Sequence, residues 1–214
     1  MLFRSKYRVD QTLDNQKIAQ SFVSIVSGQT ISRNQVFKYL PTDTSYYYSD
    51  IDKIMTETIR KFGIDEWTSC VFTNELHRHL GVYAIIGAKM GIRAREYFGI
   101  GADEMNIVSS AGLVPPYSCM NDGLQVSTGG TLGHGLITVN SNLKKEPKAT
   151  FNYLGKKISI SLKEEYRRKM ETAIREISAI YGLDSNVYWE LVRIEALNYW
   201  ANWDRHEIFD IKPE

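Results

Sequence analysis

The chain has 214 residues, of which 43% are hydrophobic, so it is long enough to form one well-filled globular domain with extensions. Its 26 basic and 25 acidic residues leave a net charge of +1, which argues against a nucleic-acid or anionic-membrane partner. Only two cysteines occur, Cys70 and Cys119, which are too few for a disulfide framework or a structural zinc site built from C-x-x-C pairs.

The first part of the chain is predicted to be helical. Apolar residues recur at roughly helical spacing over residues 10–27 and predict a first helix. Ser49 and Asp50 are suited to cap a second helix, which ends at the stop signal of Gly63. We therefore predict a helical N-terminal extension over residues 1–66.

The middle of the chain is predicted to combine a helix with strands. Helical spacing predicts a central helix over residues 80–98. Strands are expected at residues 105–111 and 134–140, and residues 149–162 read as a hairpin. These elements predict an α+β core over residues 67–165, with helices packed on a mostly antiparallel sheet of about four strands.

The C-terminal part is predicted to consist of helices packed on this core, so that the chain forms a single globular unit. Ser161 and Glu164 form a capping-box pattern at the start of one helix within residues 166–214. The last helix is rich in tryptophan and tyrosine. Core packing explains such residues, but they are also enriched at subunit interfaces, and we expect a homodimer.

His77 and His79 stand immediately ahead of the central helix. They are either a partly buried pair with satisfied hydrogen bonds or a pair of functional groups. The first explanation has weight because short motifs of this kind often match by accident. The other candidate lies further along the chain, where Pro116 suits the first position of a helix. Cys119 would then lie in the first turn, where the helix dipole favours a reactive thiolate.

Asp122 lies one helical turn beyond Cys119 and shares its face of the predicted helix. A small buried cysteine and a helix-capping aspartate are the alternative explanation. Two imidazoles, a thiolate and a carboxylate suit a divalent metal, with zinc in first place and iron or nickel as alternatives. They also suit a nucleophilic cysteine assisted by histidine.

The glycine-rich loop over residues 128–135 has a weaker pattern. A phosphate-binding P-loop needs a lysine followed by serine or threonine after its last glycine, and Leu136 stands where the lysine would be. We interpret the loop as tight turns between a helix and a strand. His134, within it, is either a ligand or an exposed turn residue.

Two separated blocks of sequence resemble one known family. The first block, from His77 to Gly91, reads H-x-H-L-G-x-Y-x-x-x-G-x-K-M-G. The second, from Pro116 to Gly135, reads P-x-S-C-x-x-D-G-L-Q-V-S-T-G-G-T-L-G-H-G. In this order they resemble the FmdE family of formylmethanofuran dehydrogenase proteins over about residues 70–165. The resemblance implies an α+β core, a dimer, and a site built from a histidine and cysteines that sometimes holds a metal.

This resemblance carries over to particular residues. It places His79, Cys119, Asp122 and Thr128 at positions of the family motifs. The chain departs from the family pattern where the H-x-C-P-G motif would have its cysteine, because Gly81 stands there. The C-terminal zinc finger of some family members is also absent from this sequence, as its cysteine count requires.

We therefore assign candidate roles within the two blocks. The candidate metal ligands are His77, His79 and Cys119. The candidate catalytic residues are Cys119, His79 and Asp122. Gln125, Thr128 and Gly129 are candidate cofactor-binding residues.

The resulting functional hypothesis is an FmdE-like, metal-binding domain protein that acts as a metal- or thiol-dependent enzyme on a small polar substrate. The alternative is a non-catalytic accessory protein that delivers a metal or cofactor to a partner metalloenzyme. The sequence does not decide between them. No run of the chain approaches the length of a membrane span, and the first residues lack an apolar signal-peptide core, so we expect a cytoplasmic protein with no membrane partner.

Overall fold

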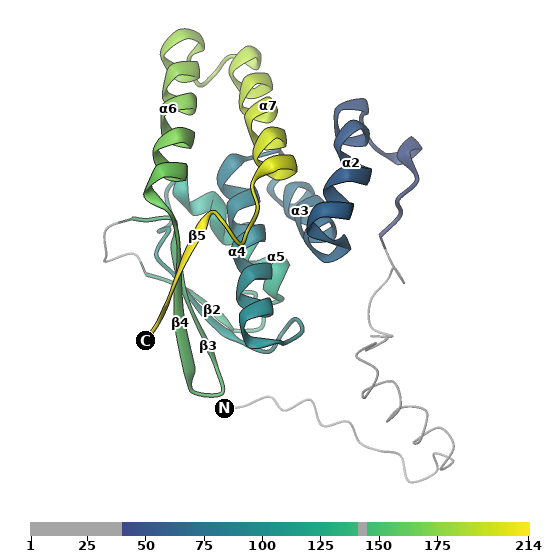
Figure 1. The fold of residues 1–214 in the computed structure, drawn as a ribbon. Helices are drawn as coiled ribbons and strands as arrows, with labels where there is room; N and C mark the ends of the chain where they lie inside the picture. Colours follow the sequence, from purple (N-terminus) through teal and green to yellow (C-terminus); the bar gives the residue numbers. More distant parts are fainter. Residues whose placement is uncertain (1–39, 141–144) are drawn as a thin grey trace. The chain divides into compact units, whose positions relative to one another are not determined.

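The computed structural model describes residues 40–140 and 145–214, and Asp43–Glu214 form one compact unit (Figure 1). The first predicted helix, over residues 10–27, lies outside the described residues. Within the described residues, no helix combines the length and apolar character needed to cross a lipid bilayer.

The unit begins with the short 3₁₀ helix η1 (Thr44–Tyr46) and the helix α2 (Ser49–Phe62), which confirms the second predicted helix. Tyr48, and not Ser49 or Asp50, occupies the cap position and makes no side-chain cap, but Oδ1 of Asp50 accepts a hydrogen bond from the N–H of Ile51 at 2.9 Å within the first turn. The buried residues of α2 recur at helical spacing and are Ile51, Met55, Thr58 and Phe62.

The helix α3 (Ile64–His77) follows after a single glycine, and no sequence pattern predicted it. Its buried face mixes aromatic and apolar residues with polar ones, namely Glu66, Trp67, Ser69, Cys70 and Thr73. The hydrophobic periodicity that normally reveals a helix is therefore weak here.

The central helix α4 (Val82–Phe98) confirms the predicted helix at residues 80–98. It contacts α3, the C-terminal helix and strand β4, and it packs most extensively against the helix α5 (Met120–Thr128). The short 3₁₀ helix η2 (Tyr117–Cys119) leads into α5, so that Cys119 caps α5 and Pro116 precedes the 3₁₀ turn.

Glycines bring α4 and α5 into backbone contact. A Cβ at Gly87 would lie 2.1 Å from the carbonyl oxygen of Met120, and a Cβ at Gly123 would lie 2.3 Å from that of Ala84. No larger residue fits at these positions without moving the helices apart. This close packing sets the start of α5, and with it Cys119, beside the first turns of α4.

The sheet confirms the α+β class and has five strands in the order β2-β1-β3-β4-β5. The pairing of β1 with β2 is parallel and the other three pairings are antiparallel, so the sheet is mixed. The strands are β1 (Asn106–Ser109), β2 (Ile137–Val139), β3 (Lys148–Tyr153), β4 (Lys156–Leu162) and β5 (Phe209–Pro213).

The hairpin predicted over residues 149–162 is confirmed, with β3 and β4 joined at Leu154 and Gly155. Both turn residues have positive φ angles, 48° and 81°, as a two-residue hairpin turn requires. The fifth strand, β5, was not predicted, because its apolar alternation is too short to stand out from a loop.

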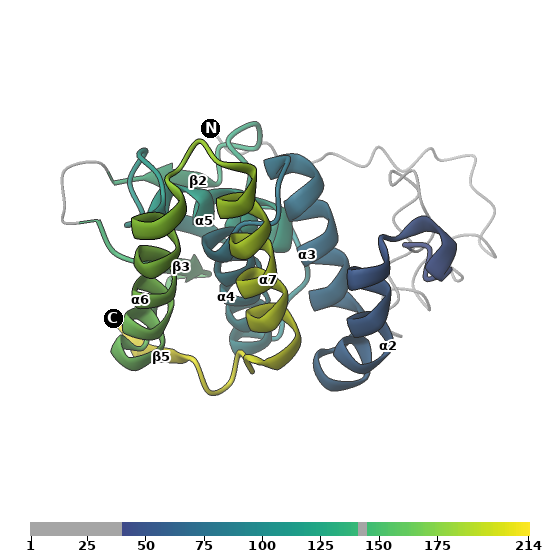
Figure 2. The same ribbon diagram turned by 90° about the horizontal axis from the view of Figure 1, so that it is seen from above.

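The helices α6 (Glu164–Tyr181) and α7 (Asn186–Asn202) lie side by side, as Figures 1 and 2 show from two directions. The predicted capping box is wrong, because Ser161 lies within β4 and Lys163 occupies the cap position. Trp200 of α7 stacks on Trp67 of α3 with ring centroids 4.5 Å apart, so this aromatic residue serves core packing, whereas Trp189 of the same helix is 45% exposed.

Candidate functional site

Three helix ends meet at the candidate site. His77 is the last residue of α3, the start of α4 follows a few residues later, and Cys119 stands directly before α5. Asp122 lies in the first turn of α5, and its Oδ2 is 2.7 Å from Nδ1 of His77. The fold therefore joins the two sequence blocks through a direct contact.

His77 is held in a strongly polar environment although only 12% of its side chain is exposed. The bond to Asp122, and after it the thiol of Cys119, raises the pKa of His77 to about 9, against the opposing effect of burial. His77 also lies at the C-terminal end of α3, where the helix dipole favours a positive charge. At neutral pH, His77 is therefore an imidazolium paired with the carboxylate of Asp122.

The second nitrogen of His77 differs from the first. Nε2 is buried, and within the described residues it has no hydrogen-bond partner. A Cβ at residue 81 would lie 3.3 Å from this atom and 3.4 Å from Nε2 of His79. Both Nε2 atoms thus border the space that Gly81 leaves open.

His79 completes this imidazole pair. Its ring centroid lies 4.2 Å from that of His77 and 4.9 Å from that of Trp189 on α7. Burial, followed by the positive charge of His77, lowers the pKa of His79 below its ordinary value of 6.5. His79 is accordingly uncharged at neutral pH. The sequence did not connect Trp189 with this site, because the two segments lie far apart along the chain.

A cleft of about 300 Å³ opens beside these residues. His77, Cys119, Asp122 and Gln125 all line it, so the structure brings these predicted residues together. The Oε1 atom of Gln125 accepts a hydrogen bond from the backbone N–H of Leu132, at 3.1 Å. The remaining lining residues are Leu113, Pro115, Ser118, Asn121, Leu132, Ile137 and Val139.

Thr128 and Gly129 do not line this cleft. The hydroxyl of Thr128 donates to the carbonyl oxygen of Leu124 at 2.6 Å and accepts from the N–H of Gly130 at 3.0 Å. Gly129 ends α5 with a φ of 69° and packs closely against Asp103. The contacts of both residues shape the end of α5, and their role in cofactor binding stays a prediction.

A complete metal-binding group is not formed by the described residues. Among them, no three or more histidine, cysteine, aspartate or glutamate side chains are arranged to hold a metal ion. Of the predicted ligands, His77 lies beside each of the other two: its ring centroid is 4.2 Å from that of His79, and the thiol of Cys119 interacts with its ring. His79 is not among the residues that line the cleft with Cys119. The atoms that could bind a metal are the open Nε2 positions and the thiol.

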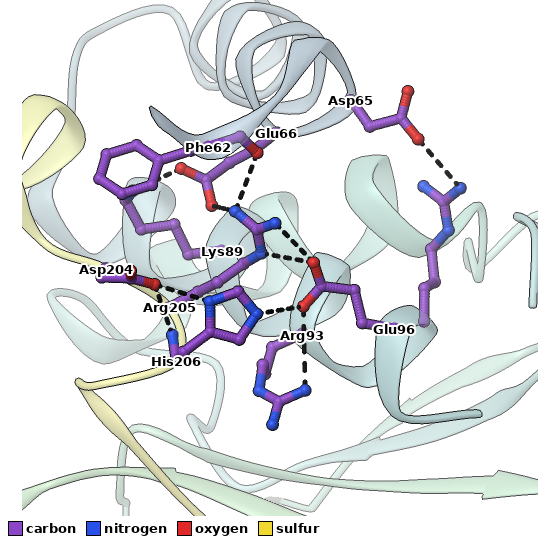
Figure 3. Close-up of polar contacts among 10 residues, drawn as sticks. Phe62, Asp65, Glu66, Lys89, Arg93, Glu96, Asp204, Arg205 and His206 are labelled. Carbon is purple, nitrogen blue, oxygen red and sulfur yellow. Dashed lines mark hydrogen bonds and ion pairs between the residues drawn. The ribbon is translucent and has the colours of Figure 1, made fainter. Parts of the chain in front are cut away.

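A second cluster of charges lies away from this cleft, and we call it the buried ionic network (Figure 3). Nζ of Lys89 donates to Oε1 of Glu66 at 2.5 Å, and both side chains are fully buried. Arg205 contacts the other oxygen of Glu66 at 2.9 Å and also bonds Glu96. His206 bridges Glu96 and Asp204. No role of Lys89 was predicted, because its partners come from distant segments.

The network joins α3 and α4 to the segment between α7 and β5. Lys89 also lies over the ring of Phe62, 4.2 Å from its centroid. Each central charge of the buried ionic network has an oppositely charged partner, which offsets the free-energy cost of removing the charge from water. The buried ionic network is therefore a structural element that anchors the C-terminal segment.

The fold and the cleft define a small α+β domain in which a histidine, a cysteine and a carboxylate meet at three helix ends. A family model described as FmdE, molybdenum formylmethanofuran dehydrogenase operon, matches residues 76–210. The match covers well over half of the chain, so the protein belongs to the FmdE family. It extends beyond the predicted range of residues 70–165 and includes α6 and α7. A comparison with curated proteins finds no match.

Proposed function

We propose that this domain binds a divalent metal ion through Nε2 of His77, Nε2 of His79 and the thiolate of Cys119. Zinc is the metal that this mixed nitrogen and sulfur donor set suits best, with iron and nickel as alternatives. The observation that carries the proposal is the buried Nε2 of His77, which has no partner among the described residues and borders the same open space as Nε2 of His79.

The bond between His77 and Asp122 supports this proposal. Histidines that bind metals usually donate their other ring N–H to a carboxylate, which fixes the tautomer and the orientation of the ring. The 2.7 Å contact from Nδ1 to Asp122 is such an arrangement, and it leaves Nε2 for the metal. His79 is uncharged at neutral pH because its pKa is lowered, and this is the form that binds metals.

Protons must leave the site when a metal binds. His77, with a pKa of about 9, carries a proton on each ring nitrogen at neutral pH, and the proton on Nε2 has to be displaced. The thiol of Cys119 must lose its proton as well. The affinity for the metal should therefore rise with pH up to about 9.

The cleft beside these residues would admit a small substrate if the domain is an enzyme. A bound metal would supply a Lewis acid at the cleft wall. His79 would move a proton when the metal is held by His77 and Cys119, and Asp122 would keep the ring of His77 in place. The alternative is an accessory role in metal or cofactor delivery to a partner metalloenzyme, which suits a family described by the operon of a molybdenum enzyme. In either role we expect a homodimer.

Elemental analysis of protein purified without a histidine tag tests the proposal. We expect close to one equivalent of metal in the wild type and its loss in His79→Ala and Cys119→Ser. His134→Ala is the matched control, because His134 is exposed and contacts the backbone of Gly129 instead of the cleft. A protein that stays free of metal after incubation with zinc, iron and nickel salts would contradict the proposal.

A second candidate function is thiol chemistry without a metal. It is favoured by the series of contacts that runs from Asp122 to His77 and from His77 to Cys119. A carboxylate that orients a histidine beside a cysteine is the arrangement of a nucleophile with its base. An imidazolium next to a sulfur stabilises the thiolate. The alkylation rate of Cys119 tests this function: we expect it to fall in His77→Ala if the imidazole activates the thiol, and to stay unchanged if it does not.

A further inference from the structure

The lining of the cleft at Cys119 indicates what kind of molecule it accepts. Besides the polar groups of the site, it is lined by five apolar residues from the loop before η2, the loop after α5 and strand β2. These are Leu113, Pro115, Leu132, Ile137 and Val139. A polar reactive group and a largely apolar wall therefore share one cavity of about 300 Å³, which is at the lower end of the size range of small-molecule sites.

Charge is the second indication. Among the described residues, no lysine or arginine lines this cleft. Nδ1 of His77 is already paired with the carboxylate of Asp122 at 2.7 Å. Carboxylate and phosphate ligands are normally held by arginine or lysine, or by helix N-termini free of acidic residues. The N-terminus of α5 has Asp122 in its first turn, so an anion meets a carboxylate there.

The amide oxygens of the cleft already accept hydrogen bonds within the protein. Asn121 accepts from the hydroxyl of Ser109 at 2.5 Å and donates to the carbonyl oxygen of Gly112 at 2.9 Å. The carbonyl oxygen of the Gln125 side chain accepts from the N–H of Leu132. A ligand that needs these oxygens as acceptors would compete with these bonds.

Apolar surface stands uncovered beside the cleft. Leu113 and Leu132 both line it, and they are 68% and 69% exposed. Single exposed leucines are ordinary, but these two belong to the same cavity as a reactive thiol. A ligand with an apolar chain would remove this surface from water when it binds.

We propose that the cleft binds an uncharged small molecule that places a polar, thiol- or metal-reactive head at Cys119 and a short apolar chain against Leu113 and Leu132. The proposal deepens the proposed function and rests on it for the identity of the reactive head. The choice of ligand class rests on the wall of the cleft alone. We therefore expect small carboxylates and phosphorylated metabolites to bind less well than uncharged molecules.

The test measures the alkylation rate of Cys119 in chelator-treated, metal-free protein by N-ethyl-, N-butyl- and N-hexylmaleimide, each divided by its rate with glutathione. Cys70 is buried and does not compete in the folded protein. We expect the corrected rate to rise several-fold from the ethyl to the hexyl reagent. We also expect uncharged iodoacetamide to be favoured over anionic iodoacetate more strongly than with glutathione.

Two leucine variants and one control locate the effect. Leu113→Ser and Leu132→Ser should flatten the dependence on chain length, and because both side chains are exposed, neither should unfold the protein. Leu154→Ser is the matched control, since Leu154 is 84% exposed at the turn between β3 and β4, outside the cleft. Its rates should equal those of the wild type.

The proposal is overturned if the corrected rate is flat across the chain lengths, if iodoacetate reacts as readily as iodoacetamide, or if Cys119 is not labelled at all. These outcomes are separable from failure of metal binding, because the protein is free of metal during the assay. A rising rate in a protein that never binds metal would uphold the ligand class and reject the metal site. A rate that does not change with chain length, in a protein that binds zinc, would reject the ligand class and uphold the metal site.

Discussion

The buried ionic network and the candidate site both place charged side chains out of water, but they differ in how completely those groups are partnered. In the network, Lys89, Glu66 and Arg205 form a chain of contacts in which each charge faces an opposite one. At the site, His77 has a carboxylate on one ring nitrogen, while the other is buried without a partner among the described residues.

Nε1 of Trp67 and Nε1 of Trp200 are also buried without a partner among the described residues, but Nε2 of His77 belongs to a residue that lines the cleft. A buried polar group without a partner destabilises the folded state, so an orphan atom in a folded protein calls for an explanation. The buried ionic network needs no such explanation, because each of its central charges is bonded to an opposite charge. The open nitrogen of His77 is explained if a ligand supplies the missing partner, and the following predictions test this contrast from the largest effect to the smallest.

Breaking the buried ionic network should have the largest effect. Lys89→Met removes the cation that faces Glu66, and the loss of one partner from a buried pair lowers the free energy of unfolding by about 3–5 kcal/mol. Urea unfolding followed by the fluorescence of the stacked pair Trp67 and Trp200 measures this change. Arg168→Gln, in an exposed ion pair on α6, should leave the unfolding curve where it is. A Lys89→Met protein as stable as the wild type would contradict a structural role for the network.

Removing the carboxylate at the site should affect metal binding more than folding. Asp122→Asn takes away the charge that orients and polarises His77, and such outer partners change metal affinity by about 10- to 100-fold. Competition for zinc against a chelating dye gives the affinity. Gln125→Ala is the matched control, because Gln125 lines the same cleft but directs its side-chain oxygen to the N–H of Leu132. Equal zinc affinities for Asp122→Asn and the control would count against the orienting role.

Filling the open space should strengthen the site. Gly81→Cys places a side chain whose Cβ lies 3.3–3.4 Å from both Nε2 atoms. The backbone there is extended, with φ −102°, so a side chain is tolerated once the rings shift slightly. An added thiolate should raise the affinity for zinc by roughly tenfold or more, a gain of about 1.4 kcal/mol. Gly81→Ala shows whether the added Cβ alone changes the affinity, and no gain in Gly81→Cys relative to it would mean that the imidazoles do not face a shared metal position.

The smallest effect is expected for a partly exposed ion pair between α2 and α7. Arg193 bonds both oxygens of Asp50, at 2.7 and 3.0 Å, and thereby lowers the pKa of Asp50 below its ordinary value of 3.8. Because the folded-state pKa is lowered, the pair stabilises the fold above pH 3.8, and this contribution is lost as the pH falls through the lowered pKa. Asp50→Asn should cost less than about 1 kcal/mol at pH 7, since solvent screens the pair. Urea unfolding at pH 7 and at acidic pH measures this, and a difference that persists at acidic pH would contradict the assignment.

Local patterns in the sequence predicted much of the fold. The helix at residues 80–98 and the hairpin at residues 149–162 follow from apolar spacing and turn residues, and the structure has both. The helix α3 was missed because its buried face includes Glu66, whose partners Lys89 and Arg205 become neighbours only through tertiary contacts. The strand β5 was missed because it is defined by its pairing with β4 more than by its own residues.

The candidate site could be predicted only in part for the same reason. His77, Cys119 and Asp122 were identified from residue type and motif spacing. Their contact depends on the close packing of α4 and α5 at Gly87 and Gly123, which no local pattern reveals. The place of Trp189 beside His79 likewise follows from the docking of α7. The capping box at Ser161 shows the opposite failure, in which a sequence pattern was matched by chance inside a strand.

The most direct test of the central claim, that His77 and Cys119 present open positions to one metal ion, is the absorption spectrum of the metal-free protein titrated with Co²⁺. We predict a thiolate-to-cobalt charge-transfer band together with the d–d bands of a low-coordinate ion, saturating at one equivalent. In Cys119→Ser, the charge-transfer band should vanish while weaker d–d bands persist, and in His77→Ala both should be lost at the same cobalt concentration. A wild-type spectrum indistinguishable from that of aqueous Co²⁺, or one that both substitutions leave unchanged, would contradict the claim.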